Sequence, residues 1–175
     1  MVSKKGSIAC FLVGVLMACS GSTEAGMLVL EPTQVAVAPV QGAEPVKTFV
    51  QFDLSGVPEG EEVVLAMLDW PLDAIPSDAW TEYAAFAVEG SWTEAQVGSG
   101  QLPEVAEVEA AWWDFAPLDY QRNGGGLVRF RLEALASGWA GGSVANHGIV
   151  IVTGAVSRAS MVSEVSSITL TVHHR

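Results

Sequence analysis

The sequence predicts an all-β fold, an antiparallel β-sandwich with about eight strands and one or two short helical turns. Several short segments alternate between apolar and polar residues or are rich in β-branched residues. Gly and Pro account for 18 and 8 of the 175 residues, and many of them lie between these segments, as expected of turns. Strands of this kind build a sandwich or a barrel. We expect a sandwich because strands that are apolar on both sides need a facing sheet.

The strand pattern occurs in eight segments, at residues 33–40, 48–54, 62–70, 83–89, 105–115, 127–132, 148–153 and 168–173. Segment 127–132 alternates cleanly and should direct Arg129 and Arg131 outward. Segment 62–70 is almost continuously apolar, which predicts a central strand covered on both faces. Segment 105–115 should place Val108, Ala110 and Trp112 on one face. Residues 27–46 supply one strand or two, and the pattern leaves that number open.

Helical signals are few. Residues 133–139 predict one or two helical turns ended by Gly138, and residues 78–83 predict another short turn. The last three residues, His173, His174 and Arg175, are expected to fray as a chain terminus.

The N-terminus has the features of a bacterial lipoprotein signal peptide. Lys4 and Lys5 precede an apolar run at residues 8–17, which is shorter than the roughly 20 residues of a membrane-spanning helix. The run ends in L-M-A-C, which resembles a lipobox and implies cleavage before Cys19 and attachment of lipid to its thiol. The alternatives are ordinary secretion with an incidental Cys, or an uncleaved apolar segment. On the lipoprotein interpretation, residues 1–18 are the signal, 19–26 the lipidated Cys and flexible tether, and 27–175 a single domain.

Charge and cysteine content narrow the function. The chain has 8 Lys and Arg against 20 Asp and Glu, a formal net charge of −12, which disfavours nucleic-acid binding. Of its two cysteines, Cys10 would leave with the signal and Cys19 would carry lipid, so the mature domain has no thiol for a disulfide or a thiolate site. We expect an exported protein anchored to the cell envelope. The outer membrane is favoured where the cell has one, because Ser20 replaces the Asp associated with inner-membrane retention.

Several motifs occur in order along the chain: F-V-Q-F-D-L-S-G-V-P-E-G at 49–60, V-E-G-S-W-T-E at 88–94, L-A-S-G-W at 135–139 and N-H-G-I-V-I at 146–151. With the final strand, this order resembles DNRLRE-type domains over residues 47–172. The resemblance implies a jelly-roll-like β-sandwich of a secreted bacterial protein. Some such domains are carbohydrate-binding modules, and others are structural or adhesive. It also implies an ion pair of Glu164 with Arg129 or Arg131.

Tryptophans are the candidate ligand-binding residues. Aromatic faces stack on sugar rings, and a nearby carboxylate accepts hydrogen bonds from hydroxyl groups, so Trp112, Trp113 and Asp114 form the most suggestive group. Adjacent strand residues point to opposite faces, so only one of the two tryptophans can be core. The alternative is that most tryptophans are core, as we expect for Trp92 and Trp139.

Metal and catalytic signals are weak. The acidic residues Asp69, Asp73 and Asp78, and likewise Glu59, Glu61 and Glu62, offer oxygen ligands for Ca²⁺, but without a calcium-loop motif they are better explained as solvated loops. No zinc-protease, nucleophile-elbow or P-loop pattern is present, so we expect no enzyme and no bound cofactor. The sequence therefore predicts a lipid-anchored envelope binding module, with polysaccharide as the candidate ligand. The alternative is a structural or protein-interaction module of the envelope.

Overall fold

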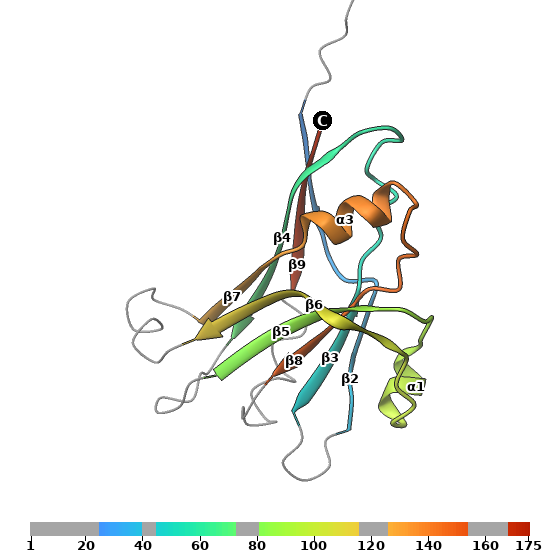
Figure 1. The fold of residues 1–175 in the computed structure, drawn as a ribbon, viewed down its shortest axis with the longest axis vertical. Helices are drawn as coiled ribbons and strands as arrows, with labels where there is room; N and C mark the ends of the chain where they lie inside the picture. Colours follow the sequence, from blue (N-terminus) through green and yellow to red (C-terminus); the bar gives the residue numbers. More distant parts are fainter. Residues whose placement is uncertain (1–24, 40–44, 73–80, 116–125, 154–167) are drawn as a thin grey trace, which may run out of the picture.

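A computed structural model describes residues 25–39, 45–72, 81–115, 126–153 and 168–175 of the chain. Within these residues, nine strands form two antiparallel sheets, and there are two short helices (Figure 1). This arrangement confirms the predicted all-β sandwich.

The four-stranded sheet has the order β1-β9-β4-β7. These strands run over Gly26–Leu30 (β1), Thr169–His174 (β9), Val63–Leu72 (β4) and Gly126–Arg131 (β7). The strand nearest the N-terminus therefore pairs with the last strand of the chain, Gly26 opposite His174 and Leu30 opposite Leu170.

The five-stranded sheet has the order β2-β3-β8-β5-β6. Its strands run over Gln34–Val37 (β2), Val46–Gln51 (β3), Ile149–Thr153 (β8), Thr81–Val88 (β5) and Val105–Phe115 (β6). When the edge strand β2 is set aside, the remaining eight strands are divided between the two sheets in the order of a jelly roll. Counted without β2, the first, eighth, third and sixth strands form one sheet, and these are β1, β9, β4 and β7. The second, seventh, fourth and fifth strands form the other sheet, and these are β3, β8, β5 and β6.

The main core fills the space between the two sheets. The inward side chains of β4, β7 and β9 meet those of β3, β5 and β8, and Trp70 packs edge-on against Tyr83 with ring centroids 5.9 Å apart. Val128, Phe130 and Leu132 are buried as their alternation predicts, whereas Arg129 and Arg131 are exposed. Helix α3, Glu133–Ala140, buries Ala136 and Trp139 against this core. It confirms the helical turns predicted at 133–139, but Gly138 does not end the helix, which continues to Ala140 and is capped by Gly141.

A second cluster covers part of the outer face of the five-stranded sheet. Helix α1, Glu94–Gly98, contributes Val97, which packs with Trp92, Phe49 and Val150. The sequence analysis missed this helix, although Thr93 and Gln96 form a capping pair in which the Gln96 amide donates to the Thr93 hydroxyl. Phe49 of β3 and Val150 of β8 are therefore buried on the outer face, whereas Lys47 of β3 is exposed and Val152 of β8 is half-buried.

Two local expectations are wrong. β4 is central in its sheet but covered on one face only, because Val64 is exposed and Leu65, Met67 and Asp69 are half-buried. On edge strand β6, whose pairing with β5 shifts register, Val108 is 74% exposed. In the segment predicted to form a helical turn at 78–83, residues 81–83 begin strand β5, and residues 78–80 lie outside the described part.

The C-terminus is also ordered by pairing rather than frayed. β9 continues to His174, whose buried imidazole Nδ1 contacts the Glu61 carboxylate. The Arg175 backbone exchanges two hydrogen bonds with Glu62, of 3.0 and 2.8 Å. Toward the other terminus, β1 includes Gly26, the last residue of the predicted tether. Residues 27–46 contribute most of β1, the whole of β2 and the first residue of β3. In the described part of the chain, no helix is long and apolar enough to cross a membrane.

Candidate functional site

The aromatic candidates lie near one end of the five-stranded sheet. Trp112, Trp113 and Asp114 belong to β6 and stand opposite Ala84, Tyr83 and Glu82 of β5. Their side chains lie outside the described part of the structure, as do Cys19, Asp73, Asp78, Trp80 and Glu164.

The tryptophans with described side chains are core residues. Trp70, Trp92 and Trp139 are all buried, which confirms the core assignment of Trp92 and Trp139. Trp92 also has a specific polar role, since its indole Nε1 donates a 2.8 Å hydrogen bond to the His147 carbonyl. None of these three side chains is placed to stack on a ligand at the surface.

The N-H-G segment at 146–148 is a structural junction. The Asn146 side chain donates to the Phe52 carbonyl at 2.8 Å and accepts from the Gly148 amide at 3.1 Å. The Gln51 side chain donates to the Asn146 carbonyl at 2.9 Å. Three of the quoted motifs therefore meet here, because Trp92 and the end of β3 both form hydrogen bonds with the turn before β8.

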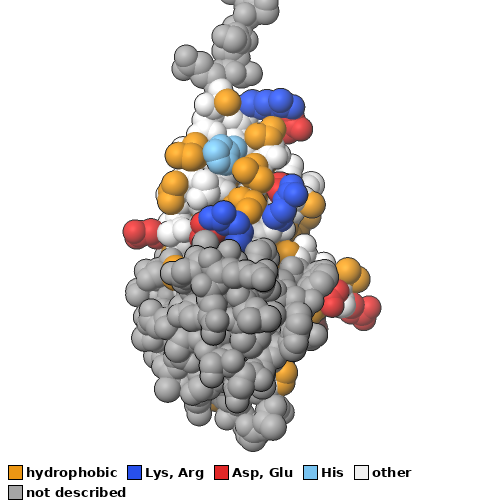
Figure 2. Space-filling model, turned by 90° about the vertical axis from the view of Figure 1, so that its left-hand side faces the viewer, with side chains coloured by type: hydrophobic (Ala, Val, Ile, Leu, Met, Phe, Trp, Pro, Cys, Tyr) orange, Lys and Arg blue, Asp and Glu red, His pale blue; other side chains and the backbone are white. Residues whose placement is uncertain are grey.

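A different surface combines concavity with polar side chains. The outer face of the four-stranded sheet contains a hollow of about 550 Å³, which we call the polar hollow. Its lining residues are Leu65, Met67, Asp69, Arg129, Arg131, Thr171 and His173. On the side of the molecule shown in Figure 2, basic side chains and a histidine lie among hydrophobic ones in the upper part.

Strand register explains this grouping. Met67 of β4 stands opposite Arg131 of β7 on one side and Thr171 of β9 on the other. Two residues before Met67 in β4, Leu65 is opposite His173 of β9. Two residues after Met67, Asp69 is opposite Arg129 of β7. Directly opposed residues of antiparallel strands share a face. Side chains of three neighbouring strands, β9, β4 and β7, therefore line the hollow, and Leu65 and Met67 belong to the middle strand, β4.

Ion pairs hold the two arginines of the hollow in place. Arg129 donates through Nε and Nη2 to the two Asp69 carboxylate oxygens at 2.5 and 2.8 Å, a bidentate pair. The hydrogen bonds to Asp69 raise the pKa of Arg129 above its ordinary value, so the guanidinium stays charged. Arg131 donates to Glu133 at 2.9 Å. The arginines predicted to pair with Glu164 thus have other partners in the described structure.

The acidic residues considered for calcium are mostly engaged in pairs. Asp69 binds Arg129, Glu61 contacts His174 and Glu62 lies 3.4 Å from Arg175. Across the described ranges, no group of three His, Cys, Asp or Glu side chains is gathered as a metal site would require. These pairings fit a structural role for Asp69, Glu61 and Glu62.

Sequence reasoning found the outward direction of Arg129 and Arg131 but missed the polar hollow. The sequence does contain outward polar positions on three separate segments that could have indicated it. These positions are Asp69, Arg129 with Arg131, and Thr171 with His173. Only the order β9-β4-β7 brings these residues together.

No protein-family model matches this chain, and no curated protein matches it in sequence.

Proposed function

We propose that the protein is a lipid-anchored, non-enzymatic module of the bacterial cell envelope that binds polysaccharide through the polar hollow. The observation that carries the proposal is the combination of fixed hydrogen-bonding groups with a partly apolar floor in one hollow. The resemblance to DNRLRE-type domains and the lipobox support the same assignment.

The chemistry of the polar hollow suits a sugar ring. A pyranose has hydroxyl groups that both donate and accept hydrogen bonds, and C–H groups that pack against apolar atoms. Arg131 and His173 offer donors, Thr171 a hydroxyl, and Asp69 an acceptor, while Leu65 and Met67 offer apolar contact. The bidentate pair fixes Arg129 and Asp69 before a ligand arrives, which lowers the entropic cost of binding.

The first test is electrophoresis through gels that contain neutral or acidic polysaccharides, with and without Ca²⁺. We expect retardation by at least one polysaccharide. The variant Arg131→Ala should weaken that binding about tenfold or more, because a hydrogen bond to a charged group contributes roughly 1.5–3 kcal/mol. The matched control is Arg175→Ala, which also removes one exposed arginine and its ion pair but lies outside the polar hollow.

Two results would contradict the saccharide assignment. One is equal retardation of the Arg131→Ala and Arg175→Ala variants, which would place binding elsewhere. The other is no retardation by any polysaccharide. The search would then move to protein partners, for which Met27 and Val29 on edge strand β1, each 59% exposed, offer an apolar contact surface.

The proposed anchor is tested separately. Cys19→Ser removes the thiol to which lipid would be attached, so we expect the protein to leave the membrane fraction and to stop incorporating labelled fatty acid. Cys10→Ser is the matched control and should leave both properties unchanged. Persistence of Cys19→Ser in the membrane fraction, extractable only with detergent, would refute lipidation as the means of anchoring.

A further inference from the structure

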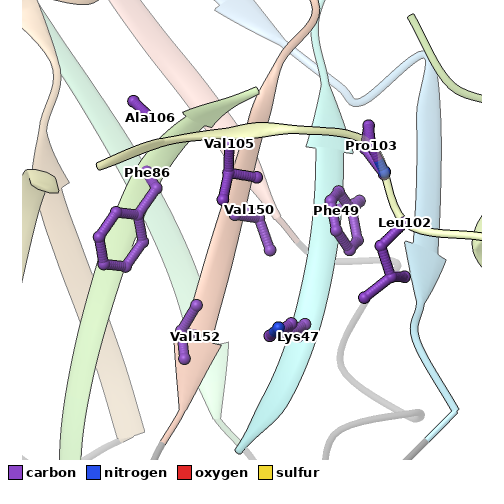
Figure 3. A pocket seen from close by; sticks show the side chains of 9 residues that line it. All are labelled: Lys47, Phe49, Phe86, Leu102, Pro103, Val105, Ala106, Val150 and Val152. Carbon is purple, nitrogen blue, oxygen red and sulfur yellow. The ribbon is translucent and has the colours of Figure 1, made fainter. Parts of the chain in front are cut away.

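A second hollow lies on the opposite side of the sandwich, on the outer face of the five-stranded sheet (Figure 3). We call it the apolar pocket. It has a volume of about 240 Å³, and eight of its nine lining residues are apolar. They are Phe49, Phe86, Leu102, Pro103, Val105, Ala106, Val150 and Val152, and the ninth is Lys47.

The register of three strands builds the floor of the apolar pocket. Val150 of β8 stands opposite both Phe49 of β3 and Phe86 of β5. In the neighbouring row, Val152 of β8 is opposite Lys47 of β3. The segment from Leu102 to Ala106 crosses over these strands and closes one side, as Figure 3 shows.

The second core cluster covers only part of this apolar face. Trp92 packs on Phe49 with ring centroids 5.7 Å apart, and α1 adds the buried side chain of Val97. Beyond them, Phe86 and Val152 are only half-buried although they belong to the same apolar surface. The sheet thus retains uncovered apolar area inside a shaped pocket.

Lys47 gives the apolar pocket a charge preference. Its side chain is exposed, and no carboxylate of the described residues pairs with it. The other described Lys and Arg residues, Arg129, Arg131 and Arg175, belong to or directly follow strands of the four-stranded sheet. In a chain of formal net charge −12, this cation at an apolar pocket favours a ligand with an anionic end.

The pocket volume limits the size of the apolar part. A protein cavity of about 150 Å³ holds one benzene ring, so by proportion about 240 Å³ holds roughly ten carbon atoms. We infer that the apolar pocket binds a free medium-chain fatty acid, with the alkyl chain against Phe49, Phe86 and Val152 and the carboxylate at Lys47. This site is separate from the polar hollow, so it does not depend on the proposed saccharide binding.

The inference is tested by calorimetric titration of the full chain carrying Cys19→Ser, which has no attached lipid to compete. The probes are hexanoate, octanoate, decanoate and dodecanoate, each below its critical micelle concentration. We expect Kd to fall about fourfold for each added methylene and then to level off within the series when the pocket is full. A Kd that keeps falling at the same rate through dodecanoate would overturn the inference, because adsorption to a surface has no such limit.

Charge variants test the role of Lys47. Lys47→Gln should weaken decanoate binding about tenfold or more. Lys47→Glu should lose decanoate and gain decyltrimethylammonium. Because Lys47 is exposed, neither change removes a core contact. Equal decanoate affinity of the wild-type and Lys47→Gln chains would overturn the assignment of the carboxylate.

Two further measurements separate the pocket from other sources of binding. Val152→Phe fills the pocket with a strand-forming side chain and should abolish decanoate binding while retaining the wild-type melting temperature within a few degrees. The control Val64→Phe places the same ring on the exposed side of β4 and should bind decanoate normally. Binding of the Cys19→Ser chain to phosphatidylglycerol vesicles that Lys47→Gln abolishes would instead assign Lys47 to a membrane surface and overturn the free fatty acid as ligand.

Discussion

At the scale of single residues, Gly148 shows how a motif position is fixed by backbone geometry. It has a φ of 82°, and a Cβ built on it would lie 2.2 Å from the Val50 carbonyl oxygen. The obstacle is backbone of the paired strand β3, which cannot rotate away. Only glycine therefore lets β8 begin where Asn146 and Trp92 fasten the turn.

We predict that Gly148→Ala destabilises the fold by more than about 2 kcal/mol, because the left-handed conformation costs roughly 1–2 kcal/mol and the clash adds to it. The control is Gly60→Ala. Gly60 has a similar φ of 85° but nothing within 4 Å of its built Cβ, so only the conformational cost applies. Urea unfolding measures both. Equal losses of unfolding free energy in the two variants would contradict this prediction, because they would show that β3 moves aside to accommodate the methyl group.

At the scale of secondary-structure elements, edge strand β6 is long but protected. It spans 11 residues, carries the exposed carboxylates of Glu107 and Glu109, and shifts register twice against β5. Charges and bulges both hinder pairing with a strand of another molecule. Because of these features, the exposed side chain of Val108 does not turn β6 into an edge that pairs with strands of other molecules.

We predict that the double variant Glu107→Val, Glu109→Val aggregates, because it converts residues 105–111 into an uncharged, strand-forming edge. Light scattering at increasing protein concentration checks this. Two valines at Glu59 and Glu62, which lie outside the strands, serve as the control for lost charge. If both double variants scatter equally, net charge rather than edge protection keeps the protein monodisperse.

Local pattern predicted the elements well where one side of a strand faces the core. Alternation located β7 and β9 closely, and a short apolar run located β8. Helix α3 was also predicted, although it continues past Gly138, the residue expected to end it. The local pattern failed for β1, whose sequence G-M-L-V-L has no polar alternation and adjoins the predicted tether. For β4, an apolar run did not show which face would be covered.

The polar hollow was less predictable than the elements that form it. Its residues are separated by up to about a hundred positions and are joined by strand pairings such as Met67 with Arg131 and Leu65 with His173. Such registers depend on tertiary structure, since a one-residue slip would reverse every outward side chain. The pattern of a single strand therefore predicts that a side chain points outward, but it does not predict which side chains of other strands lie next to it.

At the scale of the whole molecule, the fold depends on its last strand. β9 lies between β1 and β4, and it contributes the fully buried side chains of Leu170 and Val172 to the core. Without β9, β1 has no partner in the described structure and β4 loses one of its two neighbours. The four-stranded sheet is thus completed only by the end of the chain.

We predict that a chain ending at residue 167 does not fold cooperatively. It should unfold without a sharp transition and bind a dye that detects exposed apolar surface. A chain ending at His174 is the control, because it loses mainly the backbone bonds and the exposed ion pair of Arg175 with Glu62. A sharp thermal transition in the chain ending at residue 167 would contradict the central role assigned to β9.

The pairing of β1 with β9 also sets the timing of folding during synthesis. At the usual 5–20 residues per second, roughly ten seconds or more separate the emergence of β1 from that of its partner. Through that interval β1 has no pairing partner among the described strands. The four-stranded sheet of the nascent chain therefore stays incomplete until the ribosome has synthesised β9, and the earlier strands of that sheet stay unassembled for that time.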